Sequence, residues 1–308
     1  MNDLIQNVSD TAFMVATFRA METERPDPLF RDPLADKLAG TRGREIVAQL
    51  HRSARFGEWF VTIRTLIIDD FIAKALAEGI DAIVNLGAGL DTRPYRMELP
   101  ATLNWIEVDF PHMIEWKEAR LADATPRCHL ERVSLDLADV AKRRAFFADV
   151  AARSKNVFVL TEGVIPYLPV EAVAELADDI RSHDSFRFWV ADYLSPEVRR
   201  YRQKMDKKMR MQNAPFLFDP GEYFGFFGSH GWNAREIRYV GDEAQKLKRW
   251  PVIPVYMKLI LRIRNLFGNR KRREAFLKLM AYVLFEPKSS RPENSSPEST
   301  SPKRASSE

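Results

Sequence analysis

The sequence predicts an α/β fold in which helices cover a mostly parallel sheet of seven strands, and three observations carry this prediction. Short apolar segments alternate with amphipathic segments of about a dozen residues across 79–192, as in strand–helix–strand units. The segment 82–93 (AIVNLGAGLDTR) has the pattern of a buried strand that enters a tight glycine turn. Acidic residues follow several apolar segments, where a parallel sheet gathers its ligand-binding groups.

The first part of the chain, 1–78, is predicted to be helical. Residues 11–21 carry apolar side chains at helical spacing, and the prolines of 26–28 end this helix. Asp32-Pro33 opens a second, short helix with proline in its first turn. Residues 56–77 form a longer amphipathic helix with Arg64 inside its apolar face. An arginine among apolar neighbours either extends to water or pairs with an anion, and the pattern alone leaves both open.

Five strands and four helices are predicted in the central part of the chain, 79–192. The strands are rich in branched and aromatic residues, and the helices between them have proline, aspartate or threonine near their starts. The predicted strands are 82–86, 104–109, 129–135, 156–160 and 186–191. The predicted helices are 91–97, 111–122, 139–153 and 169–182.

The alternation stops at residues 193–231, which are rich in methionine and aromatic residues. Either these residues pack as helices against the core, or part of them forms a helical cap over an apolar substrate pocket. Strands are predicted again at 235–240 and 281–285, within a last part that spans 232–288. The serine- and proline-rich tail, 289–308, is predicted to be disordered because it has too few apolar residues to bury.

Composition bounds the class of protein. Residues 1–288 are expected to form a single domain, and the 45% of hydrophobic and 29% of charged residues are ordinary for a soluble globular chain. Cys128 is the only cysteine, so no intramolecular disulfide can form. The first residues lack a secretory signal, and no apolar run reaches the roughly 18 residues of a membrane span. We therefore expect a cytoplasmic protein.

The positive charge of the chain is local. Residues 246–273 contain ten Lys or Arg and no Asp or Glu, so the rest of the chain carries 4 − 10 = −6. A protein-wide field of the kind that nucleic acid requires is absent, and no nucleic-acid binding is expected. Within this stretch, 252–278 reads as a cationic helix. It could be a solvated face, a peripheral contact to anionic lipid or a contact for an acidic partner.

The glycine turn and the acid after the second strand together predict a nucleoside-cofactor site. Gly87 and Gly89 would let the backbone approach a ligand closely. Asp109 ends the second strand twenty residues beyond Gly89, where a carboxylate can accept hydrogen bonds from two ribose hydroxyls. Asp136 and Glu162 follow the third and fourth strands, so all these residues are expected at one edge of the sheet.

Four motifs carry a resemblance to a known family. NLGAGLDTRPYR, EVDFP, SLDL and TEGVIPYL are similar to segments of the leucine carboxyl methyltransferase-like family, which includes bacterial O-methyltransferases of polyketide synthesis. The resemblance spans roughly residues 11–240. It implies a class I methyltransferase-type (Rossmann-like) fold and S-adenosyl-L-methionine (SAM) as the cofactor. The implied activity is O-methylation of a small-molecule carboxylate or hydroxyl group.

The resemblance also implies which residues bind the cofactor. Arg64 would meet the methionyl carboxylate, with Glu162 near the amino group. Asp109 would bind the ribose, and Asp136 with Leu137 would line the adenine. The implied set is Arg64, Gly87, Gly89, Asp109, Asp136, Leu137 and Glu162. Arg19 is a weaker candidate for a second basic contact.

The residues themselves also favour SAM over a nicotinamide dinucleotide. SAM carries a carboxylate, an ammonium, a sulfonium and a ribose, so its site needs an anion binder and acids but no phosphate cradle. A dinucleotide would want a third glycine after Gly89, where this chain has Leu90, and Asp91 would repel phosphates. An NAD-dependent dehydrogenase is therefore the weaker enzyme interpretation.

The acceptor and any catalytic base cannot be read from the sequence. Tyr167, Tyr193 and His230 are candidate bases, and none stands out. The histidines show no metal-ligand spacing, so no metal is expected. A protein C-terminal carboxyl methyltransferase and a non-catalytic binding protein that keeps the cofactor fold remain alternatives.

Overall fold

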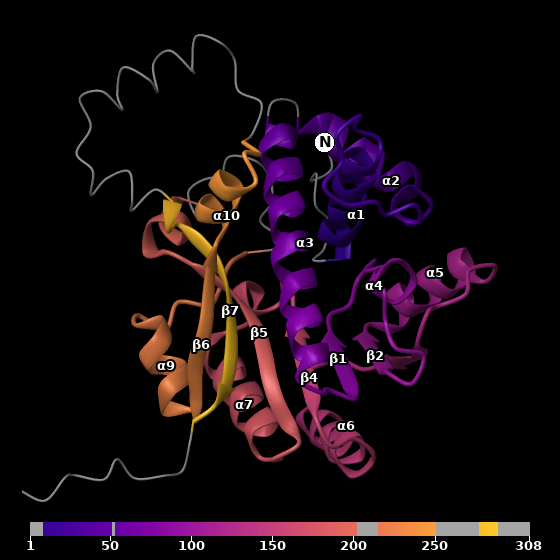
Figure 1. Ribbon diagram of the computed structural model, residues 1–308. Coiled ribbons are helices and arrows are strands. Elements are labelled where there is room, and N and C mark those ends of the chain that lie inside the picture. Colours follow the sequence, from indigo (N-terminus) through magenta and orange to yellow (C-terminus); the bar gives the residue numbers. More distant parts are fainter. Residues whose placement is uncertain (1–8, 51–52, 202–214, 251–276, 289–308) are drawn as a thin grey trace, which may run out of the picture.

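The computed structural model describes residues 9–50, 53–201, 215–250 and 277–288, which form a seven-stranded sheet with helices on both faces (Figure 1). The strand order is β3-β2-β1-β4-β5-β7-β6. All neighbours from β3 to β5 are parallel, whereas β7 runs antiparallel to both β5 and β6. The predicted fold class, a mostly parallel seven-stranded sheet, is confirmed.

The strands lie where the sequence predicts them, with differences at their ends. β5 continues three residues beyond its predicted end at Ala191, and β6 begins three residues before Arg235. Both extensions pair with β7. A local sequence pattern cannot predict this pairing, because β7 is distant along the chain. The strands are β1 Ala82–Leu86, β2 Asn104–Asp109, β3 His129–Ser134, β4 Val157–Thr161, β5 Phe186–Leu194, β6 Trp232–Tyr239 and β7 Met280–Pro287.

The helices predicted at 11–21, 56–77, 91–97, 111–122, 139–153 and 169–182 are present with shifted ends, whereas α10 and the short helix η1 lie outside the predicted ranges. Proline opens α5, as the sequence suggests, and the Asp139 carboxylate caps α6 by accepting from the Lys142 N–H at 3.1 Å. The helices are α1 Ser9–Thr23, α2 Ala35–Gln49, α3 Ser53–Ala77, α4 Arg93–Arg96, α5 Pro111–Leu121, α6 Val140–Arg153, η1 Ile165–Tyr167, α7 Val170–Arg181, α9 Tyr223–Ser229 and α10 Val240–Lys246.

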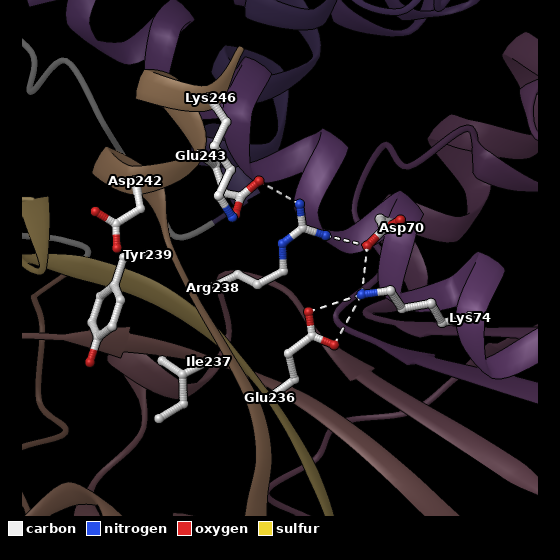
Figure 2. Close-up of a pocket in the computed structure, with 9 residues that line it drawn as sticks. All are labelled: Asp70, Lys74, Glu236, Ile237, Arg238, Tyr239, Asp242, Glu243 and Lys246. Carbon is white, nitrogen blue, oxygen red and sulfur yellow. Dashed lines mark hydrogen bonds and ion pairs between the residues drawn. The ribbon is translucent and has the colours of Figure 1, made fainter.

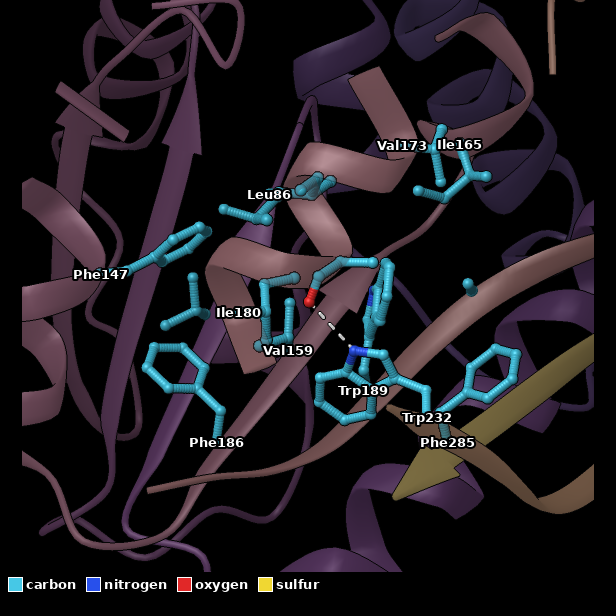
Figure 3. Close-up of a cluster of buried hydrophobic side chains, with 14 of the residues drawn as sticks. Leu86, Phe147, Val159, Ile165, Val173, Ile180, Phe186, Trp189, Trp232 and Phe285 are labelled. Atoms are coloured by element: carbon cyan, nitrogen blue, oxygen red, sulfur yellow. Dashed lines mark hydrogen bonds between the residues drawn. The ribbon is translucent and has the colours of Figure 1, made fainter. Parts of the chain in front are cut away.

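One face of the sheet packs against α6, α7 and α9. Trp189 and Trp232 meet edge to face, with ring centroids 5.4 Å apart, and Phe285 lies beside Trp189 (Figure 3). The buried Trp232 donates its indole N–H to the Ala177 carbonyl of α7 at 3.1 Å, so its polar atom is satisfied. Burial of each such side chain stabilises the fold by about 1.5–3 kcal/mol.

The opposite face packs against the long helix α3. Along β4, Val157 and Val159 belong to the core beneath α6 and α7, while Phe158 and Leu160 belong to the core beneath α3. Because successive strand residues point to opposite faces, a strand covered on both sides is apolar throughout. The continuous apolar run that predicted β4 therefore reflects two packed layers of helices.

The described part of residues 193–231 belongs mainly to the core. Phe218, Tyr223 and Phe227 are buried in the cluster beneath α7 and α9, which is the first of the two interpretations above. Residues 202–214 of the suggested cap fall outside the described residues.

Other expectations concern segments that the structure does not cover. The basic stretch 252–278 lies almost wholly outside the described residues, as does the serine-rich tail 289–308. Among the described helices, none is long and apolar enough to cross a membrane. The single-domain division of the chain stays a prediction.

Candidate functional site

The residues predicted to bind a cofactor gather at the carboxyl edge of the sheet. Gly87 follows β1, Asp109 ends β2, and Glu162 follows β4. β2, which follows β1 along the chain, lies on one side of β1, whereas β5, which follows β4, lies on the opposite side of β4. The direction in which successive strands are added to the sheet therefore reverses between β1 and β4. Ligands of open α/β sheets bind in the crevice at such a switch point.

The glycine turn is held against the end of β2 by backbone hydrogen bonds. The Gly87 and Ala88 N–H groups donate to the Val108 carbonyl at 2.8 and 3.1 Å. The Asp109 carboxylate accepts from the Gly89 N–H at 2.6 Å and from the Phe110 N–H at 2.7 Å. Burial raises the pKa of Asp109, and these two N–H groups partly offset the rise. Asp109 therefore lies at the turn with lone pairs left for a hydroxyl ligand.

Gly87 needs its missing side chain both for its backbone conformation and for space. Its φ is 65°, and an added Cβ would lie 2.5 Å from Cγ2 of Val164. Val164 is β-branched and directly precedes η1, so relief of this contact would require its backbone to move. We expect Gly87→Ala to lower the free energy of unfolding by about 2–3 kcal/mol, from left-handed strain and overpacking together.

Gly79→Ala is the matched control for this substitution, measured by urea unfolding of both variants. Gly79 has a φ of 83° but nothing within 4 Å of an added Cβ, so only the strain applies. Its loss should be about 1 kcal/mol. Equal losses for the two variants would show that the close approach of Val164 to the turn does not matter.

The N-terminal helices support the glycine turn. Arg19 of α1 donates to the Asp32 carboxylate at 2.8 Å and to the Leu90 carbonyl at 2.5 Å. The Thr92 hydroxyl donates to the same Asp32 oxygen at 2.6 Å. Arg19 is thus engaged in holding the turn, and a direct contact of this side chain with a ligand is not needed to explain its burial.

A buried network of arginines and carboxylates lies beside the turn and is called here the rim cluster. Its ion pairs link α3, the segment after β1 and the end of β4. The members are Arg64, Asp69, Asp91, Arg93, Arg96, Glu162 and Asp192.

Arg64 points to Glu162, which settles the choice left open by the sequence. Its Nε lies 2.6 Å from Oε1 of Glu162, but the N–H is not aligned with any acceptor, so this buried donor lacks a proper hydrogen bond. Burial lowers the pKa of Arg64, but the Glu162 carboxylate, with smaller contributions from Tyr282 and Asp192, raises it above its ordinary value. Burial likewise raises the pKa of Glu162, while Arg64 and Arg93 bring it below its ordinary value. Both side chains are held in their charged forms.

Arg93 is a central member of the cluster that sequence reasoning missed. Its guanidinium contacts Asp69 at 2.7 Å, Asp91 at 2.8 Å and Glu162 at 2.7 Å. The motif TRPYR contains Arg93, but its partner Asp69 lies on a helix whose register the sequence did not fix. The structure also corrects the interpretation of Asp91. Its carboxylate is buried and paired with Arg93, so it presents no free charge to repel a phosphate.

Asp136 and Leu137 lie at the same edge, beyond β3. The exposed Asp136 carboxylate accepts from the Ala138 N–H at 2.9 Å and caps the turn before α6. The Leu137 carbonyl accepts from Arg143 at 2.6 Å, which fixes the backbone of this loop. In the strand order, β3 lies on one side of β2, and β1 and β4 lie on the other. Asp136 and Leu137 therefore lie on one side of Asp109, and the rim cluster lies on the other.

Asp192 is a second functional candidate that the sequence did not reveal, because the predicted fifth strand stopped at Ala191. The carboxylate is only 6% exposed and accepts from the Gly163 N–H at 2.9 Å. Burial raises the pKa of Asp192 to about 6, although Arg64 and the Gly163 N–H oppose the rise. Asp192 thus titrates well above an ordinary aspartate.

The candidate bases differ in position. His230 precedes β6 at the edge opposite the rim and pairs with Asp178 at 2.7 Å, so it cannot reach the crevice. Tyr193 stacks on Phe224 near the end of β5, and Tyr167 ends η1. No catalytic base is assigned. Among the described residues, no group of three His, Cys, Asp or Glu side chains is arranged to hold a metal ion.

A charged pocket of about 320 Å³ lies away from the rim, between α3, β6 and α10 (Figure 2). Figure 2 shows that most of its charges pair with one another: Arg238 contacts both Asp70 and Glu243, and Lys74 contacts Glu236 at 3.0 Å. These neutralised side chains do not converge on an empty point. We assign the pocket to the edge of the sheet and give it no ligand.

The strand order, the antiparallel β7 and the switch point between β1 and β4 define a fold of the class I methyltransferase type. The sequence model of the leucine carboxyl methyltransferase family matches residues 12–181, which are more than half of the chain. The protein therefore belongs to the leucine carboxyl methyltransferase family.

Two relatives are similar to this chain in sequence, and one solved structure shares its fold. A protein of Mycobacteroides abscessus, named "Putative S-adenosyl-L-methionine-dependent methyltransferase", is 32% identical over 64% of this chain and 69% of its own length. A relative of the same name from Mycobacterium bovis is 32% identical over 69% of this chain, which spans 65% of that relative, just under two thirds. The crystal structure titled as a putative methyltransferase from Thermobifida fusca shares the fold, with a TM-score of 0.52 and 14% identity over 92% of this chain and 95% of that one.

Proposed function

We propose that the protein is a SAM-dependent methyltransferase whose cofactor binds in the crevice between β1 and β4. The observation that carries the proposal is the convergence of Arg64, Asp109 and Glu162 around one glycine turn, from three separate parts of the chain. Family membership and the names of the two mycobacterial relatives support the same cofactor.

The side chains at the rim fit the functional groups of SAM. The buried Arg64 Nε has no aligned acceptor, and a ligand carboxylate would supply one. Asp109 would accept from the ribose hydroxyls while the Gly89 N–H keeps it in place. Glu162 would face the amino group, and Asp136 with Leu137 would border the adenine. Gly87 and Gly89 would border the cofactor with their backbone, because Val164 and Ala12 already occupy the space that side chains at these positions would need.

The reaction we propose is transfer of a methyl group to an oxygen nucleophile. When bound, SAM supplies a sulfonium-activated methyl group, and in-line displacement gives a methylated acceptor and S-adenosylhomocysteine (SAH). The protein's part is to align the acceptor oxygen and exclude water. A carboxylate acceptor needs no base, whereas a hydroxyl acceptor loses its proton.

We propose a small-molecule carboxylate or hydroxyl compound as the acceptor. The resemblance of the motifs around Gly87 and Glu162 to a family that includes bacterial O-methyltransferases of polyketide synthesis supports this choice. A protein C-terminal carboxylate is the alternative acceptor within the family. Peripheral lipid contact through the basic stretch stays a separate hypothesis, tested by salt-sensitive sedimentation with anionic vesicles.

Isothermal titration calorimetry with SAH and with NAD tests the proposal. We expect SAH to bind at micromolar concentrations and NAD to give no heat of binding. Binding of NAD without SAH would favour a dehydrogenase. Binding of neither would contradict a cofactor site at this rim. Binding of SAH without transfer to any carboxylate or hydroxyl acceptor would indicate a binding protein that keeps the fold.

A further inference from the structure

The rim cluster contains one more carboxylate than arginine. Arg64, Arg93 and Arg96 form ion pairs with Asp69, Asp91 and Glu162. Asp192 is the fourth acid, and within the described residues it makes no ion pair of its own. When all seven groups are ionised, the cluster therefore carries one uncompensated negative charge, and that charge is on Asp192.

The residues that pack around Asp192 shield its carboxylate from water. The Gly163 N–H donates to the carboxylate, and Tyr223 of α9 donates its hydroxyl to the Asp192 backbone carbonyl at 2.8 Å. Tyr282 of β7 is the register partner of Asp192 and is 1% exposed. The titratable and charged side chains that face Asp192 are Arg64 from α3, Glu162 after β4, Tyr282 from β7 and Tyr223 from α9.

We propose that Asp192 is a specificity-determining residue that favours the sulfonium form of the cofactor over its neutral thioether product. The inference rests on the proposed function. SAM and SAH have the same ribose, adenine, amino and carboxylate groups, so contacts to those groups cannot distinguish them. SAM carries one additional positive charge on sulfur, and transfer of the methyl group removes it. The uncompensated Asp192 carboxylate attracts the positive sulfur of SAM and has no such attraction for the neutral sulfur of SAH, so it stabilises bound SAM selectively.

The strand spacing sets the size of the effect. The sulfur of a ligand that lies between Asp109 and Arg64 would be over β1 and β4, whereas Asp192 is on the next strand, β5. Neighbouring strands are about 4.8 Å apart, so the two charges would be separated by on the order of 10 Å. Coulomb's law with an effective dielectric constant of about 20–40 then predicts about a four- to fifteenfold preference for SAM.

The preference should depend on pH with a definite sign. A carboxylate whose pKa is about 6 is mostly protonated at pH 5 and mostly ionised at pH 7. The ratio of dissociation constants, SAH over SAM, should therefore rise by about three- to sixfold from pH 5 to pH 7, because about a tenth of the carboxylate is already ionised at pH 5. Across this range the amino groups of both ligands stay largely protonated, since a free α-amino group titrates near 8.

The test is calorimetric titration of both ligands into wild type and Asp192→Asn at pH 5, 6 and 7. Asparagine keeps the shape and an oxygen for the Gly163 N–H but cannot ionise. For Asp192→Asn we expect the ratio of dissociation constants, SAH over SAM, to be lower than that of wild type at pH 7 and to stay constant with pH. Thermal unfolding of the variant checks that it is folded, and a structural role would weaken both ligands together without changing the ratio.

His112→Gln is the control, because it changes a second polar side chain close to the carboxyl end of β2 without touching Asp192. His112 lies near the rim, where it contacts Ser9 at 2.9 Å and stacks on Phe110. The pH dependence of the ratio should persist in this variant. Its loss in His112→Gln, or its persistence in Asp192→Asn, would overturn the inference about Asp192. Failure of both ligands to bind at every pH would instead overturn the proposed function.

Discussion

Replacing Arg93 by methionine is expected to lower the free energy of unfolding by about 3–5 kcal/mol. Arg93 is 2% exposed and is the shared partner of Asp69, Asp91 and Glu162. Its loss leaves three buried carboxylates with fewer positive neighbours, and uncompensated buried charge is the costly part of a broken ion pair. Urea unfolding monitored by circular dichroism measures the change.

Arg153→Met is the control for Arg93→Met. Arg153 forms an ion pair with Glu131 at 2.7 Å, as close as those of Arg93, but both side chains are 37% exposed. Water screens such a pair, so its loss should cost less than about 1 kcal/mol. If Arg93→Met cost no more than Arg153→Met, the rim cluster would not depend on Arg93 as its common cation.

Asp109→Ala is expected to weaken SAH binding by about 100-fold or more. Two hydrogen bonds from the ribose to a carboxylate contribute roughly 1.5–3 kcal/mol each. The substitution also releases the Gly89 N–H from its acceptor, which loosens the turn that the ligand would cross. Asp136→Ala serves for comparison, because we propose that the exposed Asp136 borders only the adenine, and its loss should weaken SAH binding by less than about tenfold. An Asp109→Ala protein that binds SAH as tightly as wild type would contradict the assignment of the ribose site.

The part of the site that could be predicted from the sequence depends on strand ends. Gly87, Asp109 and Glu162 were found because each follows a short apolar run, and parallel strands bring such positions to one edge. Asp136 was found in the same way. Arg64 was visible as a charge within an apolar helix face, but its partner was not.

The part that could not be predicted depends on contacts between distant segments. Asp192 lies in β5 only because pairing with β7 extends that strand beyond Ala191. The role of Arg93 requires the position of Asp69 on α3, which packing sets. The burial of Phe218 and Phe227 likewise follows from β6 and β7, so composition alone could not distinguish a core from a cap.

The most direct test of the account compares two ligands with Arg64→Gln and Asp109→Ala. SAH carries the amino-acid group, whereas 5′-methylthioadenosine has the same ribose, adenine and sulfur without it. If Arg64 holds the methionyl carboxylate, Arg64→Gln should weaken SAH by about 50-fold and leave methylthioadenosine unchanged within about twofold. Asp109→Ala should weaken both ligands. Equal weakening of both ligands by Arg64→Gln, or of neither, would contradict a SAM site that runs from Asp109 to Arg64.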